Sequence, residues 1–155
     1  MKGQTAVEYL MTYGWAILII LIVAGVLAYY GIFAPAGFLG PTARGFGQVQ
    51  VLNPWAVSTA GVVTLNLANR VGGAINITQA VLTIDATDYT CTPTVELEIA
   101  SGEDDTFTCT SAPTPITGAD TGESYSATTV ISYRYPSDAA TADFSTSGTI
   151  TGTYS

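Results

Sequence analysis

The chain has 155 residues and a formal net charge of −8, with twelve acidic residues, four basic residues and no histidine. So few cations make nucleic acid an unsuitable partner, because binding to a phosphate backbone depends on lysine and arginine. The lack of histidine also removes the side chain that most often serves as a general base in catalysis.

The first residues combine a very short basic stretch with a carboxylate beside an apolar segment. Residues 1–3 carry one cation, Lys2, and Glu8 comes directly before an uncharged run over residues 9–43. Three residues are too few for an ordinary secretory signal, yet Lys2 is enough to hold the amino terminus on the cytoplasmic side. The sequence therefore predicts a leader at 1–3 followed by a hydrophobic helix over residues 4–39.

The centre of this segment has the composition of a membrane-spanning helix. The nine Ile, Leu and Val residues between Ile17 and Leu27 favour insertion by about 3–5 kcal/mol. As a helix, residues 9–33 would rise about 37 Å, more than the roughly 30 Å of a bilayer's hydrocarbon core. Aromatic residues at the two ends fit the two membrane interfaces; they are Tyr9, Tyr13 and Trp15 at one end and Tyr29, Tyr30 and Phe33 at the other.

Two other interpretations of this segment remain open. Ala34-Pro35-Ala36 offers a small-x-small sequence at which a signal peptidase could cut, but the apolar run exceeds the roughly 7–15 residues of a cleaved signal and Glu8 is acidic where such signals are basic. A plain single-span anchor for an outer domain also fits the length and the flanking residues.

The stretch Lys2-Gly3-Gln4-Thr5-Ala6-Val7-Glu8 resembles the class III signal of archaeal type IV pilins. In that family a membrane prepilin peptidase cuts before a Gln, and a Glu follows at the fifth mature position. The resemblance implies cleavage between Gly3 and Gln4. Two positions depart from the common family pattern, with Ala6 in place of Ser and Thr12 in place of Leu.

This resemblance implies a structural subunit of an adhesion pilus. It implies a homopolymer, a helical filament on the cell surface, built from a single-pass membrane precursor. It also implies that the partners are the prepilin peptidase, a type IV pilus assembly ATPase and its membrane platform. A membrane-anchored surface domain that binds a ligand as a monomer is an alternative, as is a minor pilin-like protein of a secretion or assembly machinery.

Glu8 requires a partner both in the membrane and in a filament, because an ionised carboxylate in apolar surroundings costs several kcal/mol unless it is paired. Cleavage before Gln4 creates an α-amine with a pKa of about 8. We expect Gln4 and Glu8 to serve in assembly, with that amine meeting the carboxylate within or between subunits. A Gln4 that cyclised to pyroglutamate would carry no such charge.

The pattern changes after the apolar segment. The helix is expected to end among Pro35, Gly37, Gly40 and Pro41. From Phe46 onward the sequence shows period-two alternation typical of strands. It predicts an α+β chain whose outer part, residues 40–155, is a β-sandwich of immunoglobulin-like size. The expected strands are 48–51, 63–67, 75–78, 81–84, 95–99, 107–110, 128–135 and 149–154, with turns at Asn53-Pro54, Gly72-Gly73, Ser101-Gly102, Thr117-Gly118 and Pro136-Ser137.

Cys91 and Cys109 are the two cysteines, and both lie in the outer part. A disulfide between them suits an oxidising exterior. Two buried free thiols are the alternative, and a metal site is remote because histidine is absent and no third cysteine exists.

Other candidate sites in the outer part are few. Asn76-Ile77-Thr78 is a glycosylation sequon, although Asn76 could equally be an outward polar residue of a strand. The acidic cluster of residues 103–105 matches no calcium loop and is expected to be a solvated hairpin tip. With no nucleophile beside an activating group and no phosphate-binding glycine loop, we expect no enzyme and no cofactor.

Overall fold

The computed structural model describes residues 4–30, 40–137 and 143–155. It divides into two compact units, Met1–Phe38 and Leu39–Ser155. The first contains the helix, and the second, called the β-domain below, contains every strand of the described residues. The chain therefore combines an apolar helix with an antiparallel β-sandwich, as an α+β protein.

The helix α1 runs from Gln4 to Tyr29, 26 residues, and rises about 39 Å at 1.5 Å per residue. Its long run of Leu, Ile, Val and Ala favours a helix that is apolar on every side. Tyr30 still donates its amide to the carbonyl of Val26 at 3.0 Å. The rest of the helix expected over 4–39, residues 31–39, lies outside the described residues.

Nine strands make up the described β-domain. They are β1 (Thr42–Arg44), β2 (Val49–Val57), β3 (Val62–Asn69), β4 (Ile75–Ile84), β5 (Thr87–Cys91), β6 (Leu97–Ile99), β7 (Asp104–Ala112), β8 (Ser124–Arg134) and β9 (Phe144–Thr153).

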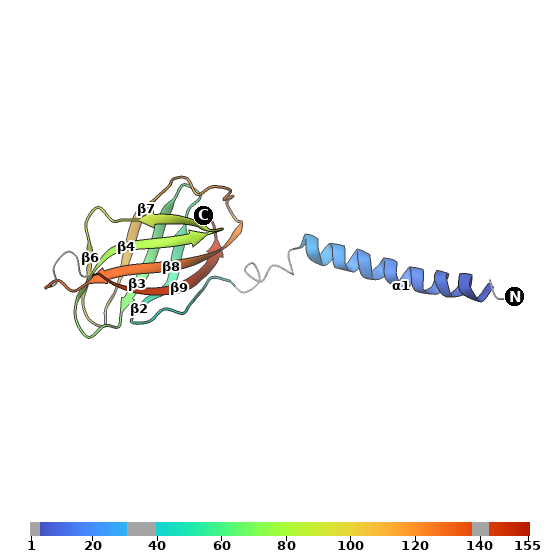
Figure 1. Cartoon of the computed structure of the whole chain (residues 1–155), viewed down its shortest axis with the longest axis horizontal. Helices are drawn as coiled ribbons and strands as arrows, with labels where there is room; N and C mark the ends of the chain where they lie inside the picture. The colour runs from blue at the N-terminus through green and yellow to red at the C-terminus, as the bar shows by residue number, and fades with distance from the viewer. Residues whose placement is uncertain (1–3, 31–39, 138–142) are drawn as a thin grey trace. The chain divides into compact units, whose positions relative to one another are not determined.

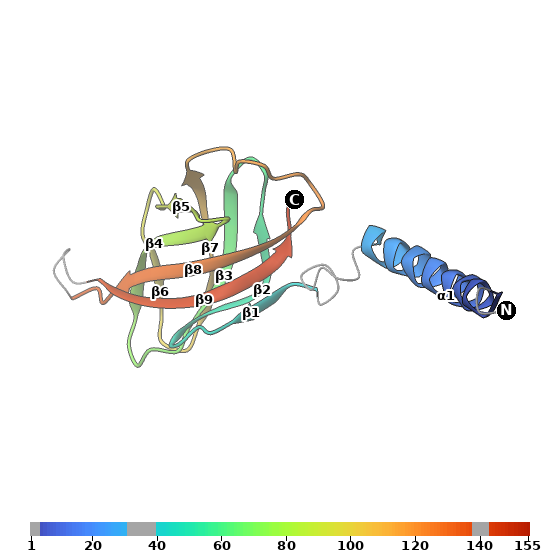
Figure 2. The ribbon, with the colours of Figure 1, turned by 45° about the vertical axis from the view of Figure 1, so that its right-hand side comes forward.

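These strands form two antiparallel sheets joined at one corner. The larger sheet has the order β1-β9-β8-β4, with β5 and β6 both paired to the far edge of β4. The smaller sheet is β2-β3-β7. The end of β7 also pairs with β5, through Cys91 opposite Ser111. Figures 1 and 2 show β8 and β9 running across β2 and β3, so the two sheets enclose the core between them.

The opposite side of the sandwich is closed by the residues that follow β9. Ser155 donates its amide to the carbonyl of Val57 at 3.1 Å, and its carbonyl accepts the amide of Thr59 at 3.3 Å. Tyr154 donates its amide to the carbonyl of Glu123 at 2.9 Å, which extends the pairing of β8 with β9. The larger sheet is thus tied to the end of β2, which gives the sandwich a partly barrel-like closure.

Alternation along the strands supplies one continuous core. In β4 and β8, buried residues alternate with outward polar ones, as expected for a sheet that faces solvent on one side. The largest fully buried side chains are Phe107, Leu65, Leu67, Ile75, Ile77, Leu82, Ile99, Ile131, Ile150, Val49, Val57 and Val63.

Several predicted boundaries were wrong. The turn predicted at Asn53-Pro54 lies inside β2, where the register shifts between Leu52 and Ala56 and the strand continues. The segments 75–78 and 81–84 are one strand, β4, because an extra residue at Thr78 forms a bulge that keeps both halves facing the core.

The strands β1 and β5 were not predicted, and the acidic cluster was placed wrongly in part. Glu103 follows the turn at Ser101-Gly102 as expected, but Asp104 and Asp105 already belong to β7, where they pair with Ala68 and Leu67 of β3. These two carboxylates are exposed on the first residues of a strand.

Candidate functional site

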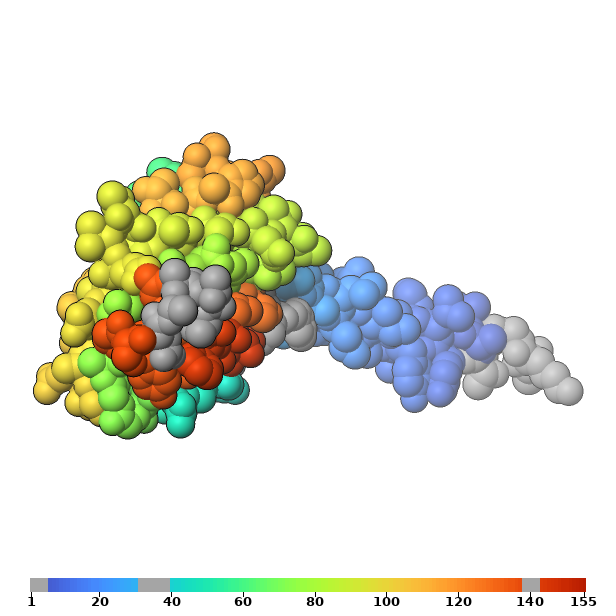
Figure 3. Space-filling view, turned by 60° about the vertical axis from the view of Figure 1, so that its left-hand side comes forward, coloured from blue at the N-terminus to red at the C-terminus, as the bar shows by residue number. Residues whose placement is uncertain are grey.

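The apolar helix is the most distinctive surface of the chain. Among the described residues, Ala6–Tyr29 is the one segment whose length and composition suit a membrane-spanning helix, and none of it is buried in the structure. Figure 3 shows side chains of the helix, in blue, at the surface of the face in view. Leu10 is 76% exposed and Ile20 65%. A surface of this kind needs a dry environment, since burying it is worth about 25 cal/mol for each Å².

Glu8 is the only charged residue between Gln4 and Tyr29. The structure places it on the exposed surface of the helix, in its second turn, and its backbone carbonyl accepts a bond from the Thr12 hydroxyl at 2.9 Å. That bond uses the backbone and leaves the carboxylate available. Within the described residues the carboxylate forms no ion pair.

The predicted processing residues lie at the boundary of the described chain. Gly3 is outside the described residues, as is Lys2, and Gln4 is the first residue of α1. Cleavage before Gln4 would therefore place the new amine at the first position of the helix, where the helix macrodipole is positive. The amine and Glu8 would then be about one helical turn apart along the same rod.

Aromatic residues lie near both ends of α1, although Phe33 of the second predicted group is outside the described residues. The rings of Tyr9 and Tyr13, one turn apart, have centroids separated by 4.2 Å. Those of Tyr29 and Tyr30 meet edge to face at 5.7 Å. This spacing of aromatic residues fits the two interfaces of a bilayer.

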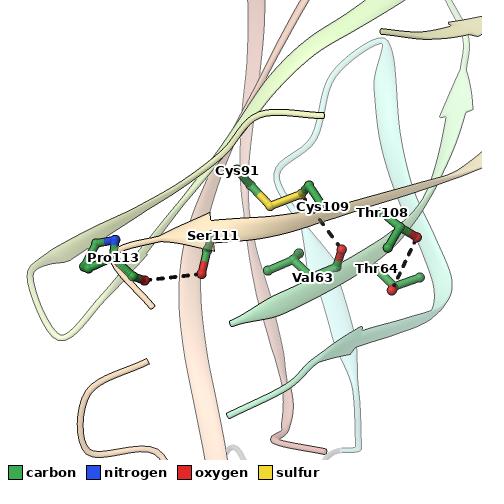
Figure 4. Close-up of a disulfide and its surroundings, with 7 residues drawn as sticks. All are labelled: Val63, Thr64, Cys91, Thr108, Cys109, Ser111 and Pro113. Atoms are coloured by element: carbon green, nitrogen blue, oxygen red, sulfur yellow. Dashed lines mark hydrogen bonds between the residues drawn. A yellow bond between two sulfur atoms is a disulfide. The ribbon is translucent and has the colours of Figure 1, made fainter. Parts of the chain in front are cut away.

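In the β-domain, Cys91 and Cys109 are joined by a disulfide, with their Cα atoms 5.7 Å apart. Both residues are buried. Figure 4 shows the bond beside Ser111, the residue through which β7 pairs with β5. The disulfide thus fastens the corner at which the two sheets meet, and it is typical of proteins outside the cytosol.

Asn76 lies in the interior of the larger sheet, between Glu98 of β6 and Arg134 of β8. It is half-buried, and its side-chain nitrogen donates to Glu96 at 3.3 Å. Glu96 also forms an ion pair with Arg134. The nitrogen that a glycan would occupy is therefore engaged in the folded domain, and glycosylation of Asn76 stays a prediction.

Sequence reasoning did not find the cluster of Asn76, Glu96 and Arg134. Glu96 and Arg134 lie 38 positions apart, and only the pairing of β4 with both β6 and β8 brings them together. No short-range motif carries that information. The described residues contain no group of three acidic or cysteine side chains placed to hold a metal ion.

A search against models of known protein families and a search of curated proteins each found no match to this chain.

Proposed function

We propose that this protein is the structural subunit of an archaeal type IV pilus or related adhesion filament, with an immunoglobulin-like outer domain typical of a pilin. The observation that carries the proposal is an apolar helix, none of whose membrane-length segment is buried, with a single carboxylate, Glu8, near its amino-terminal end. The remaining support is the class III signal-like stretch around Gly3 and Gln4 and a disulfide-bonded β-domain suited to the cell exterior.

The helix accounts for both stages of such a subunit. Before assembly, its apolar surface resides in the bilayer, with the β-domain outside. After a prepilin peptidase cuts between Gly3 and Gln4, the ATPase and its membrane platform pass the subunit into a filament, where helices of many copies bury one another. Burial among neighbours on all sides explains why α1 lacks a polar face.

The β-domain is consistent with an immunoglobulin-like arrangement. Its strands cross from one sheet to the other between β1 and β2, β3 and β4, β6 and β7, and β7 and β8, and connections between sheets of this kind occur in Greek-key sandwiches. Its outer surface supplies the exposed part of the filament, which is the part that contacts other surfaces in adhesion.

The amino terminus decides between this function and a monomeric surface anchor. We expect mass spectrometry of subunits sheared from cells to find a chain that starts at Gln4, and electron microscopy to find it in filaments. Deletion of the host's prepilin peptidase should leave the full-length precursor in the membrane. Full-length chains that begin at Met1 and are dispersed over the cell surface would instead support the anchor.

Replacement of Glu8 tests the assembly step. Glu8→Gln removes the charge that the new amine would meet, so we expect normal membrane insertion with a large loss of filaments. Glu98→Gln is the matched control, because Glu98 is exposed on β6 and the same change there should leave assembly intact. Filaments formed at the normal rate by Glu8→Gln would exclude a role for this carboxylate.

A further inference from the structure

The β-domain contains a polar hollow, of about 120 Å³, at the end of the sandwich where β9 ends. Asp85, in the turn between β4 and β5, and Glu123, directly before β8, form part of its rim. Ser124 and Ser126 add hydroxyls, while Tyr125 and Tyr154 are buried beneath, with ring centroids 4.9 Å apart. We call this site the acidic hollow.

The negative charge of the acidic hollow is not compensated within the described residues. Asp85 and Glu123 are both exposed, and neither carboxylate forms an ion pair with another described residue. The pKa of Tyr154 is raised by burial and further by the carboxylates of Asp85 and Glu123. Negative charge beyond that of the two carboxylates is thus disfavoured here, and a cation is favoured.

The chain has few cations, and two of them have a partner within the described residues. Of its four, Lys2 lies in the leader that cleavage would remove. Arg134 pairs with Glu96, and Arg70 donates to the carbonyl of Gly102 at 3.1 Å. Arg44, on β1, is exposed, and its guanidinium bonds to no group in the described residues.

We propose that Arg44 of one copy docks into the acidic hollow of a second copy, as a contact between β-domains in the filament. A planar guanidinium bonds two carboxylates and hydroxyls at once, and it stacks on aromatic rings. The hollow offers all three kinds of partner in a volume suited to one side-chain head group. This inference rests on the proposed function.

The geometry of the two surfaces suits a polymer. Arg44 lies opposite Thr149 on the outer edge of β9, and the acidic hollow lies beyond β9 at Ser124 and Ser126 of β8. These are different patches of one domain, so in a helical filament each copy can place its Arg44 on one neighbour and offer its acidic hollow to another, which makes the contact heterologous. Heterologous contacts repeat without closing unless the rotation forms a ring, and therefore build open chains of subunits.

Charge exchange between the two patches tests the contact in full-length protein. Arg44→Glu should raise the concentration of free subunit that remains after filaments are pelleted by about five- to thirty-fold. Glu123→Arg should do the same, and the double variant should return it to near the wild-type value. Asp85 has a φ of 48°, a conformation that Asn tolerates, so Asp85→Asn is the third single variant and should weaken assembly in the same direction.

Arg70→Glu is the matched control, because it makes the same charge change at an exposed arginine elsewhere in the domain. We expect it to assemble as the wild type does. Normal assembly by Arg44→Glu, or failure of Glu123→Arg to rescue it, would overturn the contact while leaving the proposed function in place. A wild-type chain that forms no filaments would overturn the proposed function itself, and the contact with it.

Discussion

Asn69, the last residue of β3, holds together two loops at one end of the sandwich. Its buried side-chain nitrogen donates to the carbonyls of Gly73 and Ile99, both at 2.9 Å, and of Ala100 at 3.2 Å. Its side-chain oxygen accepts the amide of Val71 at 2.8 Å. One amide group thus satisfies backbone groups of the β3–β4 loop, of the last residue of β6 and of the residue that follows it.

Replacement of this side chain should be among the most damaging single changes in the β-domain. Asn69→Ala leaves several buried backbone groups without partners, each at a cost of about 1–3 kcal/mol, so we expect the free energy of unfolding to fall by about 3 kcal/mol. Guanidinium denaturation measures the loss.

Asn66→Ala provides the control for that change. Asn66 lies on the same strand, points to the half-buried outer side, and its side chain bonds to no group in the described residues. We expect its replacement to cost less than about 1 kcal/mol. Equal losses for the two variants would show that Asn69 has no special role in the loops.

Buried tyrosines make the β-domain sensitive to alkali. Burial raises the pKa of Tyr125 to about 12, and burial also raises the pKa values of Tyr133 and Tyr154. In the unfolded chain these phenols ionise near pH 10, so above that pH the unfolded state releases protons that the folded state retains. Stability is therefore complete below pH 10 and decreases as the pH rises toward 12.

We expect the melting temperature to be nearly constant from pH 7 to pH 9 and to fall steeply above pH 10. Once the pH is above the pKa of Tyr125 in both states, the free energy of unfolding should have fallen by about 2 to 3 kcal/mol through this phenol alone. Tyr125→Phe removes that phenol and should make the decrease shallower, even if its stability at neutral pH differs. A Tyr125→Phe curve parallel to the wild-type curve would show that this phenol does not control the alkaline transition.

At the scale of elements, the alternation of most strands was evident from the sequence, but the length of each strand was not. The segments of β4 on both sides of Thr78 were predicted as strands, and only their connection was missed. A bulge adds one residue without changing which face is buried, so two correct half-strands look like two separate strands. In β2, Pro54 indicated a turn because proline cannot donate to a ladder, yet an edge strand tolerates it at an irregularity.

The missed strands have a different cause. Residues 87–91 are short and polar, and Tyr89 and Cys91 are their only buried side chains. What makes them a strand is pairing with β4 on one side and with β7 on the other. The acidic hollow was missed for the same reason, since Asp85 and Glu123 meet only through tertiary structure. Glu8, by contrast, was evident from the sequence, because it is a charged residue directly before an uncharged apolar run and no tertiary contact is needed to recognise it.

The corner between β5 and β7 depends on the disulfide more than on backbone pairing. These two strands share only two paired positions, Thr90 with Ala112 and Cys91 with Ser111. The bond between Cys91 and Cys109 spans 18 residues, and a closed loop of this length restricts the unfolded chain by about 3 kcal/mol. We expect the double variant Cys91→Ala, Cys109→Ala to lose about that much free energy of unfolding.

Reductant provides the internal control for this measurement. It should destabilise the wild type by a similar amount and leave the double variant unchanged. If the wild type unfolded at the same guanidinium concentration with and without reductant, the disulfide would contribute nothing to the corner.

At the scale of the whole molecule, the two units have opposite surface chemistry. The helix exposes apolar side chains on every side, while outward positions of the larger sheet are mostly hydroxyls. In β8 and β9 these are Ser124, Ser126, Thr128, Ser132, Ser145, Ser147, Thr149, Thr151 and Thr153. Eleven of the twelve acidic residues also lie in the β-domain. This division lets one chain associate through its helix while its outer surface stays solvated.

This division of the chain predicts that copies associate through the helix, whereas the β-domain folds stably by itself. The β-domain has its own continuous core and its own disulfide, and about 110 residues are enough to close such a core. We therefore expect residues 39–155, produced without the helix in an oxidising compartment, to be soluble, to unfold cooperatively, and to sediment as a monomer at micromolar concentration.

The full-length chain should behave in the opposite way, partitioning into detergent micelles or assembling. A contact such as that of Arg44 with the acidic hollow is worth little on its own at a solvated surface, so in the proposed filament it would act only because the helices hold neighbouring copies together. Effective concentrations in the millimolar range arise from such tethering. A tight oligomer formed by residues 39–155 alone would contradict this prediction. The β-domain would then be the primary site of association, and the helix would be a simple anchor.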